Sequence, residues 1–436
     1  MSGLREELDE LRERMERAAR VADRRSNRAP RPESAGALEM RARAFPPPGI
    51  ARHGYARTPR PAHEYAQEWL DGEEVETEFG RHFETEKLYE RHRLHGSAEI
   101  SSLEDLTTDL LAAVSSEPVA HAGVGEWAFL DTETTGLGSG ACAFLIGVGR
   151  VTREGFRVRQ FFLRDMGEEA SALDAVATHL AQFSVLITYN GRSYDLPLLA
   201  NRYHLNRAPS PFPSLDHVDL LHGSRRLWKL RFESCRLVDL ETQVLGFERR
   251  GDLAGSLIPY VYFEYLRTRE TERILPIFHH NATDILTLAC LTGIVPLAFS
   301  DPDSAALRQG AEMAGVARWL RQAGELEQAR RLFRRAIDAG LGDELLFRTL
   351  WDVAAIERKL GEMPAALEIW NDLAGSKNPF RAKAMEELAK HYEHREKDFD
   401  RALELTRAAA ELIEAKHGES PALRKREKRL EARAAR

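Results

Sequence analysis

The stretch that most constrains this chain is a short apolar segment followed by a dense group of carboxyl and hydroxyl side chains. Residues 127–130 are apolar and have the length of a buried strand, and the string Asp-Thr-Glu-Thr-Thr-Gly follows them. Residues two apart in an extended chain project to one face, so Asp131 and Glu133 lie side by side. Two such anions repel each other unless a cation lies between them, and hard oxygen ligands select Mg²⁺ or Mn²⁺. The hydroxyls of Thr132 and Thr134 can shape the turn and contact a substrate.

A second acid follows the apolar strand predicted over residues 185–188. The string Tyr-Asn-Gly-Arg-Ser-Tyr-Asp places a turn at Asn190 and then Asp195 near the start of a predicted helix, where the helix N-terminus favours a carboxylate. The alternative is that Asp195 only caps this helix, which is a common use of Asp. The acid pair upstream favours a shared metal site.

The third acid is Asp284, in a helix predicted from an apolar face that continues after it. His280 lies four residues before Asp284 and therefore shares its helical face. An imidazole beside a metal site can accept a proton from water near neutral pH. His279 is adjacent, so the sequence leaves open which of the two histidines is the general base, and we favour His280.

These three motifs together resemble the DEDD-type 3′→5′ exonuclease superfamily, and most closely its YprB-type branch. The resemblance covers roughly residues 75–300 and implies a ribonuclease H-like fold with Asp131, Glu133, Asp195 and Asp284 as ligands of two Mg²⁺ or Mn²⁺ ions. It further implies 3′→5′ hydrolysis of single-stranded DNA or RNA, releasing nucleoside monophosphates. In that superfamily the third motif carries either Tyr four residues before the Asp or His five residues before it. Here His280 stands at the four-residue spacing and His279 at the five-residue spacing, so the sequence departs from both standard forms.

The predicted fold is an α/β ribonuclease H-like domain with a mixed sheet. Three strands, 127–130, 143–151 and 156–163, are joined by short Gly-containing links that favour antiparallel pairing. A helix is predicted over 168–183, and the strand at 185–188 follows. A β-rich lead-in occupies 63–100, and another helix is predicted from Leu103 to Val114.

Between the second and third motifs lies a basic cluster interleaved with aromatic residues. Arg225 and Arg226, with Trp228 nearby, have the residue types of a single-strand binder, cations for phosphates and rings for bases. The alternative is an amphipathic helix with a solvated basic face and Trp228 in the core. We assign Asp219 to a strand-to-helix junction outside the metal site.

The N-terminal region differs in composition from the rest. Leucines at helical spacing over residues 4–22 are compatible with a short coiled coil, and residues 24–62 hold nine Arg and no Lys. The latter segment is predicted to be disordered, either as a nucleic-acid tether or as a solvated tail. The net charge is −7, the three cysteines have no CxxC spacing, and no apolar signal core begins the chain. These features predict a soluble, cytoplasmic protein without membrane spans.

Residues 303–420 are predicted to be helical, with a basic tail at 421–436. Similar turn sequences place Ala329, Ala366 and Ala402 at spacings of 37 and 36 residues. This pattern resembles tetratricopeptide repeats, which usually offer a groove to a protein partner, although a supporting role for the nuclease domain is an alternative.

Three functional hypotheses follow. The first is a metal-dependent exonuclease with the four acids and His280. The second is a nucleic-acid-binding adaptor with a weak or inactive site that recruits partners through its repeats. The third and weakest is a ribonuclease H-like endonuclease, which the Asp-Thr-Glu-Thr-Thr-Gly string disfavours.

Overall fold

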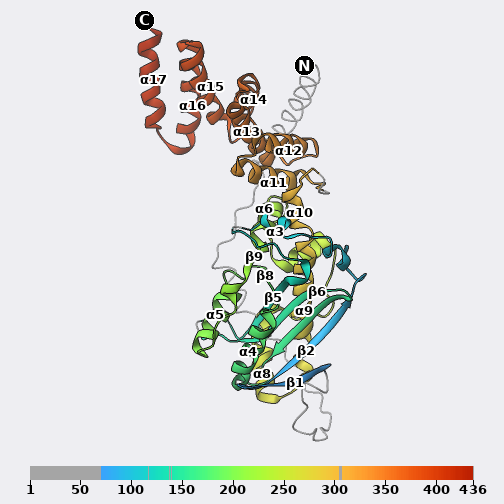
Figure 1. The fold of residues 1–436 in the computed structure, drawn as a ribbon. Coiled ribbons are helices and arrows are strands. Elements are labelled where there is room, and N and C mark those ends of the chain that lie inside the picture. The colour runs from blue at the N-terminus through green and yellow to red at the C-terminus, as the bar shows by residue number, and fades with distance from the viewer. Residues whose placement is uncertain (1–69, 116, 137, 139, 304–306, 436) are drawn as a thin grey trace. The chain divides into compact units, whose positions relative to one another are not determined.

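The structure, a computed structural model, describes residues 70–115, 117–136, 138, 140–303 and 307–435 (Figure 1). These residues form two compact units, one within Pro59–Leu307 and one within Arg308–Arg436. The predictions for residues 4–22 and 24–62 lie outside the described residues.

A seven-stranded mixed sheet forms the first unit, with the order β1-β2-β7-β6-β5-β8-β9. Its strands pair antiparallel from β1 to β5 and parallel from β5 to β9, which confirms the predicted mixed sheet. The strands are β1 (Gly72–Thr77), β2 (Gly80–Glu90), β5 (Trp127–Thr134), β6 (Ala143–Thr152), β7 (Gly155–Phe162), β8 (Val185–Thr188) and β9 (Asp216–Asp219). A separate two-stranded sheet holds β3 (Leu94–His95) and β4 (Ala98–Glu99).

The β-rich lead-in is an integral part of the main sheet. β2 pairs with β7 over a continuous register from Phe83↔Phe162 to Glu90↔Gly155. The single helix predicted from Leu103 to Val114 is wrong in extent. A 3₁₀ turn, η2 (Ile100–Leu103), and a short α3 (Thr108–Ala112) stand there instead, because Thr107 between them adopts an extended backbone.

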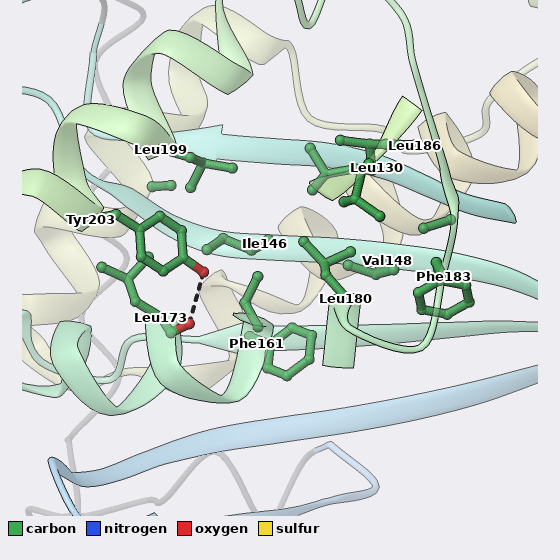
Figure 2. Close-up of a cluster of buried hydrophobic side chains, with 14 residues drawn as sticks. Leu130, Ile146, Val148, Phe161, Leu173, Leu180, Phe183, Leu186, Leu199 and Tyr203 are labelled. Atoms are coloured by element: carbon green, nitrogen blue, oxygen red, sulfur yellow. Dashed lines mark hydrogen bonds between the residues drawn. The ribbon is translucent and has the colours of Figure 1, made fainter. Parts of the chain in front are cut away.

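One face of the sheet packs against α4 (Glu169–Leu180) and α5 (Asp195–Leu205). Figure 2 shows this core, in which Leu130, Ile146 and Val148 of the sheet meet Leu173 and Tyr203 of the helices. Each large apolar side chain buried here contributes roughly 1.5–3 kcal/mol. The Tyr203 hydroxyl donates to the Leu173 carbonyl at 2.8 Å, so the polar end of this buried side chain has a hydrogen-bond partner.

The other face packs against α9 (Leu275–Thr292), which lies over β5 and β6. Gly149 permits this approach, because a Cβ atom there would lie 2.5 Å from Ile285 Cγ2. In the described chain, one helical segment, Thr271–Ser300, has the length and mean hydropathy (1.8) to cross a membrane, but 78% of its most apolar window is buried. That burial is expected of a core helix.

Four further helices of this unit accompany the sheet and the helices on its two faces. They are α6 (Leu220–Trp228), α7 (Leu237–Leu240), α8 (Ile258–Thr268) and α10 (Val295–Ser300). Tyr262 of α8 stacks on Phe144 with ring centroids 3.8 Å apart and donates to the Leu163 carbonyl at 2.9 Å. Tyr262 also belongs to one buried apolar cluster with Ile277 and Phe278, so α8 lies beside the N-terminal half of α9.

The second unit is entirely helical among its described residues. Its helices are α11 (Gly310–Ala323), α12 (Leu326–Asp338), α13 (Asp343–Leu360), α14 (Met363–Gly375), α15 (Arg381–His391), α16 (Phe399–His417) and α17 (Pro421–Ala434). Each packs on its neighbours in the chain. Gly324 and Gly361, with φ of 92° and 90°, end α11 and α13, and Lys397 takes a left-handed conformation at the third equivalent turn. A helical array is therefore confirmed, and its tetratricopeptide character stays a prediction.

The residues predicted as a basic tail form α17. Its basic side chains converge on Glu393, which is fully buried and accepts a two-pronged ion pair from Arg429 at 2.9 and 2.8 Å. Arg433 and Arg426 lie 3.5 and 3.7 Å from the same carboxylate. These arginines therefore fix α17 to the preceding helices.

Candidate active site

Asp131 and Glu133 lie within β5, and their side chains project from the face of the sheet that α9 covers. Asp131 pairs with Gly147 of β6, and Glu133 pairs with Leu145 just before a register shift between Glu133 and Thr134. Asn281 of α9 donates through Nδ2 to Asp131 Oδ2 at 2.8 Å and to the Asp131 carbonyl at 3.2 Å. Because Asn281 is fully buried, this contact fixes both the strand and the carboxylate.

Asp195 is the first residue of α5, as the sequence predicts. The turn before it has Asn190 in the left-handed region, with φ of 66°. Buried Asp219 holds that turn, because its carboxylate accepts from the backbone N–H of Asn190 at 2.8 Å and of Arg192 at 3.1 Å. It also caps α6 by accepting from Leu221 N at 3.1 Å, so Asp219 shapes the turn and its oxygens are occupied by amides.

The Thr132 hydroxyl joins the first and second motifs. It donates to Asp195 Oδ1 at 2.5 Å, so β5 and α5 are linked directly at their acidic residues. Thr134 instead donates to the Gly136 carbonyl at 3.0 Å and shapes the turn after the strand. One of the two hydroxyls thus orients a carboxylate, and the other stabilises the loop.

His280 and Asp284 complete the cluster from α9. His280 Nε2 lies 3.5 Å from Asp284 Oδ2, the contact expected for residues four apart on a helix. One ligand atom each from Glu133, His280 and Asp284 lie within 4.8 Å of one another. Acids from positions 131 to 284 of the chain are thus brought to one place by β5, α5 and α9.

His279 lies on a different side of α9. It lines a separate cavity of about 360 Å³ with Lys87 and Tyr89 of β2. Of the two histidines that the sequence left open, only His280 faces the acids in this structure.

Arg249 and Asp252 are two site residues that the sequence reasoning missed. Both lie in the loop between the π-helical turn η6 (Glu241–Leu245) and α8. The Arg249 guanidinium pairs with Asp284 Oδ1 and, through Nη1, with Asp252 Oδ2 at 3.2 Å. Asp252 Oδ1 in turn lies 2.9 Å from His280 Nδ1. No local pattern distinguishes Arg249 from its neighbour Arg250, so only the fold reveals its role.

Glu241 anchors Arg249. Its fully buried carboxylate accepts from Arg249 Nε at 2.7 Å and Nη2 at 2.8 Å, and also from Thr287. Burial opposes the ionisation of Glu241, but the hydrogen bonds from Arg249, His95 and Thr287 prevail and lower its pKa to about 2. Arg249 is therefore held in place by a carboxylate outside the acid cluster.

The four acids destabilise one another's charged forms. Burial and the neighbouring charges of Asp284, Glu133 and Asp195 raise the pKa of Asp131 well above its usual range. Burial and the charge of Asp284 do the same for the pKa of Glu133. Burial also raises the pKa values of Asp195 and Asp284, against hydrogen bonds from Thr132 and Arg249. A divalent cation would relieve this repulsion, and an all-carboxylate donor set fits Mg²⁺ or Mn²⁺.

A cavity of about 610 Å³ opens beside Asp195. It is lined by Thr132 and Thr134 of the first motif and by Tyr194, whose side chain is 54% exposed. The volume is within the range of small-molecule sites in proteins.

Arg225 and Arg226 are exposed on α6, while Trp228 is buried in the core. This is the arrangement of an amphipathic helix with a solvated basic face. Within the described residues, no hydrogen bond or ion pair joins either arginine to the four acids. The assignment of Arg225 and Arg226 to substrate binding therefore stays a prediction.

Comparison with known proteins identifies the family. A family model described as the RNase_H superfamily matches residues 128–295, the segment that carries all four acids. The uncharacterized protein YprB of Bacillus subtilis (strain 168) is 32% identical over 320 residues, which cover 72% of this chain and 76% of YprB. The chain therefore belongs to the family of YprB, and its sheet domain is a member of the ribonuclease H superfamily.

Proposed function

We propose that the protein is a DEDD-type, metal-dependent 3′→5′ exonuclease that hydrolyses single-stranded DNA or RNA. The observation that supports this most is the convergence of Asp131, Glu133, Asp195 and Asp284 from three elements beside His280. Four partly or fully buried carboxylates that repel one another reduce stability, and apolar residues of similar volume would be more stable. Such a cluster is retained for chemistry.

In this proposal the four acids hold two Mg²⁺ or Mn²⁺ ions, which activate a water and stabilise the leaving oxygen of the phosphodiester when bound. Hydrogen bonds from two other side chains orient two of these carboxylates. Asn281 orients Asp131 by bonding Oδ2, and Thr132 orients Asp195 by bonding Oδ1. Fixed ligands avoid the entropy cost of ordering them during binding.

His280 is the general base in this proposal. Its Nε2 faces the carboxylate cluster, where the attacking water would be positioned, and an imidazole accepts a proton readily near neutral pH. The 3′ end of the strand would lie in the cavity of about 610 Å³, where the exposed Tyr194 ring offers a surface for base stacking. We also propose two further substrate contacts, Thr134, which lines this cavity, and Asn190, in the turn before α5.

The test is a gel assay with Mn²⁺ on end-labelled single-stranded DNA and RNA, with 5′ and 3′ labels in parallel. A 3′→5′ exonuclease gives a shortening ladder from the 5′ label and immediate mononucleotide from the 3′ label. Asp131→Ala is the inactive control. Cleavage that is equal in the wild type and this variant would refute the assignment.

The adaptor hypothesis is the second candidate, and the ion pair between Arg249 and Asp284 favours it. This arginine supplies a positive charge to the acid cluster without a metal ion. An adaptor of this kind would bind nucleic acid and recruit a protein through the helical unit. Isothermal titration with Mn²⁺ distinguishes the two, because an exonuclease requires Mn²⁺ binding that disappears in Asp131→Ala.

A further inference from the structure

The contact between Asp252 and His280 has the geometry of a carboxylate that orients a functional imidazole. His280 Nδ1 lies 2.9 Å from Asp252 Oδ1 and 3.0 Å from Asp252 Oδ2. The other ring nitrogen, Nε2, points to the acid cluster and lies 3.5 Å from Asp284 Oδ2. One nitrogen is therefore held by the loop, and the other faces the site.

The difference between these distances favours a proton on Nδ1, because Asp252 approaches Nδ1 to 2.9 Å whereas Asp284 approaches Nε2 only to 3.5 Å. An ionised carboxylate only accepts hydrogen bonds, so His280 Nδ1 must be the donor to Asp252. Arg249 Nη1 also lies near this nitrogen, but at 3.4 Å, and its closer partner is Asp252 Oδ2 at 3.2 Å. The neutral ring then has its lone pair on Nε2, on the side of the acids.

Asp252 is itself held in place by a chain of ion pairs. Arg249 bonds Asp252, and Glu241 holds Arg249 with two hydrogen bonds of 2.7 and 2.8 Å. The Arg249 and Glu241 side chains are 6% and 0% exposed, so this anchor is shielded from water. A buried, two-pronged carboxylate–guanidinium pair allows little rotation of either partner.

We propose that Asp252 is a positioning residue that fixes the orientation and the Nδ1–H tautomer of His280, so that Nε2 is available to the substrate water. The predicted effect on the cleavage rate rests on the proposed function, whereas the predicted tautomer of His280 can be measured in the metal-free protein. Arg249 and Glu241 keep Asp252 in register with α9.

Asp252→Asn is the informative substitution because it preserves shape and changes the donor pattern. Arg249 Nη1 can only donate, so the amide oxygen would turn toward Arg249 and the amide NH₂ toward His280 Nδ1. The ring would then carry its proton on Nε2, with no lone pair toward the site. In Asp252→Ala the ring loses this partner, and only the longer contact of 3.4 Å from Arg249 Nη1 to Nδ1 remains, so both tautomers are populated.

The experiment has two readouts on the full chain. Long-range ¹H–¹⁵N spectra of ¹⁵N-histidine-labelled, metal-free protein report the His280 tautomer, with His280→Gln identifying its signals. Single-turnover cleavage of 3′-labelled DNA and RNA with Mn²⁺ reports the rate. Glu99→Gln is the matched control, because Glu99 contacts His92 Nδ1 at 2.7 Å on an exposed surface.

We expect the Nδ1–H tautomer in the wild type and in Glu99→Gln, and the Nε2–H tautomer in Asp252→Asn. The maximal single-turnover rate of Asp252→Asn should fall about 100-fold or more, with little change in the enzyme concentration that gives half of that rate. Asp252→Ala should retain more activity. An unchanged tautomer and rate in Asp252→Asn would overturn this inference. Absence of cleavage by the wild type would instead overturn the proposed function, and the spectra would still test the Asp252–His280 contact.

Discussion

A Cβ atom added at Gly147 would lie 2.2 Å from Asn281 Oδ1. No heavy atom can be accommodated at that distance, so the glycine permits α9 to approach β6 closely enough for Asn281 to reach Asp131. Gln160 supports the same amide by donating to Asn281 Oδ1 at 2.8 Å. The absence of a side chain on one strand thus determines the geometry of a carboxylate on the next.

Gly147→Ala is therefore expected to damage the site more than the fold. Displacing α9 should cost about 1–3 kcal/mol of stability, as for other overpacked cores, and should weaken Mn²⁺ binding by separating Asn281 from Asp131. Calorimetric titration and thermal unfolding measure the two effects. Gly125→Ala is the control, since a Cβ there has 4.0 Å to its nearest neighbour, Val151 O. Unchanged Mn²⁺ affinity in Gly147→Ala would show that this contact does not orient Asp131.

The two adjacent histidines should behave differently. His280→Gln is expected to reduce the cleavage rate by about 10²–10⁴-fold, the usual contribution of a general base. His279→Gln should stay within about twofold of the wild type, because His279 lines the cavity beside β2 and not the acid cluster. Single-turnover kinetics at saturating Mn²⁺ make the comparison. Equal losses in both variants would contradict the assignment of the base.

Asp131→Asn should abolish cleavage and stabilise the metal-free protein. Its carboxylate is destabilised by burial and by three neighbouring acids, so neutralising it removes repulsion worth about 1 kcal/mol or more. For a domain of this size, that corresponds to an increase in the thermal midpoint of about 2–4 °C. Scanning calorimetry with and without Mn²⁺ checks this, with the exposed Asp105→Asn as control. A lower midpoint for metal-free Asp131→Asn would show that the acid stabilises the fold.

His179 should make stability depend on pH between about 4 and 6.5. It is buried between Phe161 and Phe183, and burial, followed by the charges of Arg159 and Arg150, lowers its pKa from 6.5 to about 4. The unfolded chain then binds more protons than the folded chain in this window, so stability decreases as pH falls from 6.5 to 4.

The full effect is on the order of 3 kcal/mol, at 1.36 kcal/mol per pKa unit. In His179→Leu, the difference in unfolding free energy between pH 7 and pH 4 should be smaller than in the wild type by that amount. Urea unfolding at a series of pH values measures it. An equal slope in His179→Leu and the wild type would disprove the prediction.

Glu393→Gln should loosen the last helix of the chain. Three arginines of α17 lie within 3.7 Å of the fully buried Glu393 carboxylate. Removing a buried charge from such a cluster costs about 3–5 kcal/mol in dry interiors, and we expect about 2 kcal/mol here because the arginines are partly exposed. Limited proteolysis should cut α17 first. Glu431→Gln, which loses one exposed pair with Arg407, is the control, and equal resistance of the two variants would argue against this anchor.

The sequence predicts well those features that are encoded locally. The apolar runs identify β5 to β8, and Asp195 is found at the first turn of α5, because hydrophobic periodicity and turn residues act over a few positions. The four acids could be predicted because each lies in a short motif of several polar residues. The split helix near Thr107 was missed, since its extended backbone is decided by packing.

Features that depend on distant contacts could not be predicted in this way. Arg249 contacts Asp284, 35 residues later in the chain. β2 joins the sheet by pairing with β7, a strand distant in the chain, from Glu90↔Gly155 to Phe83↔Phe162. Neither contact produces a periodic pattern in the amino-acid sequence. The choice between His279 and His280 likewise needed the direction in which each side chain leaves α9.

Asn281 and Asp131 are separated by 150 residues, and this separation has a consequence for the order of events during synthesis. While the ribosome is still translating the segment before α9, the emerging chain already contains β5 and the first three acids but lacks Asn281, Asp284 and His280. Domains fold as units once their last element is available. The nascent chain therefore acquires a complete site only after α9 has left the ribosome, when the message that encodes the sheet domain has already been read.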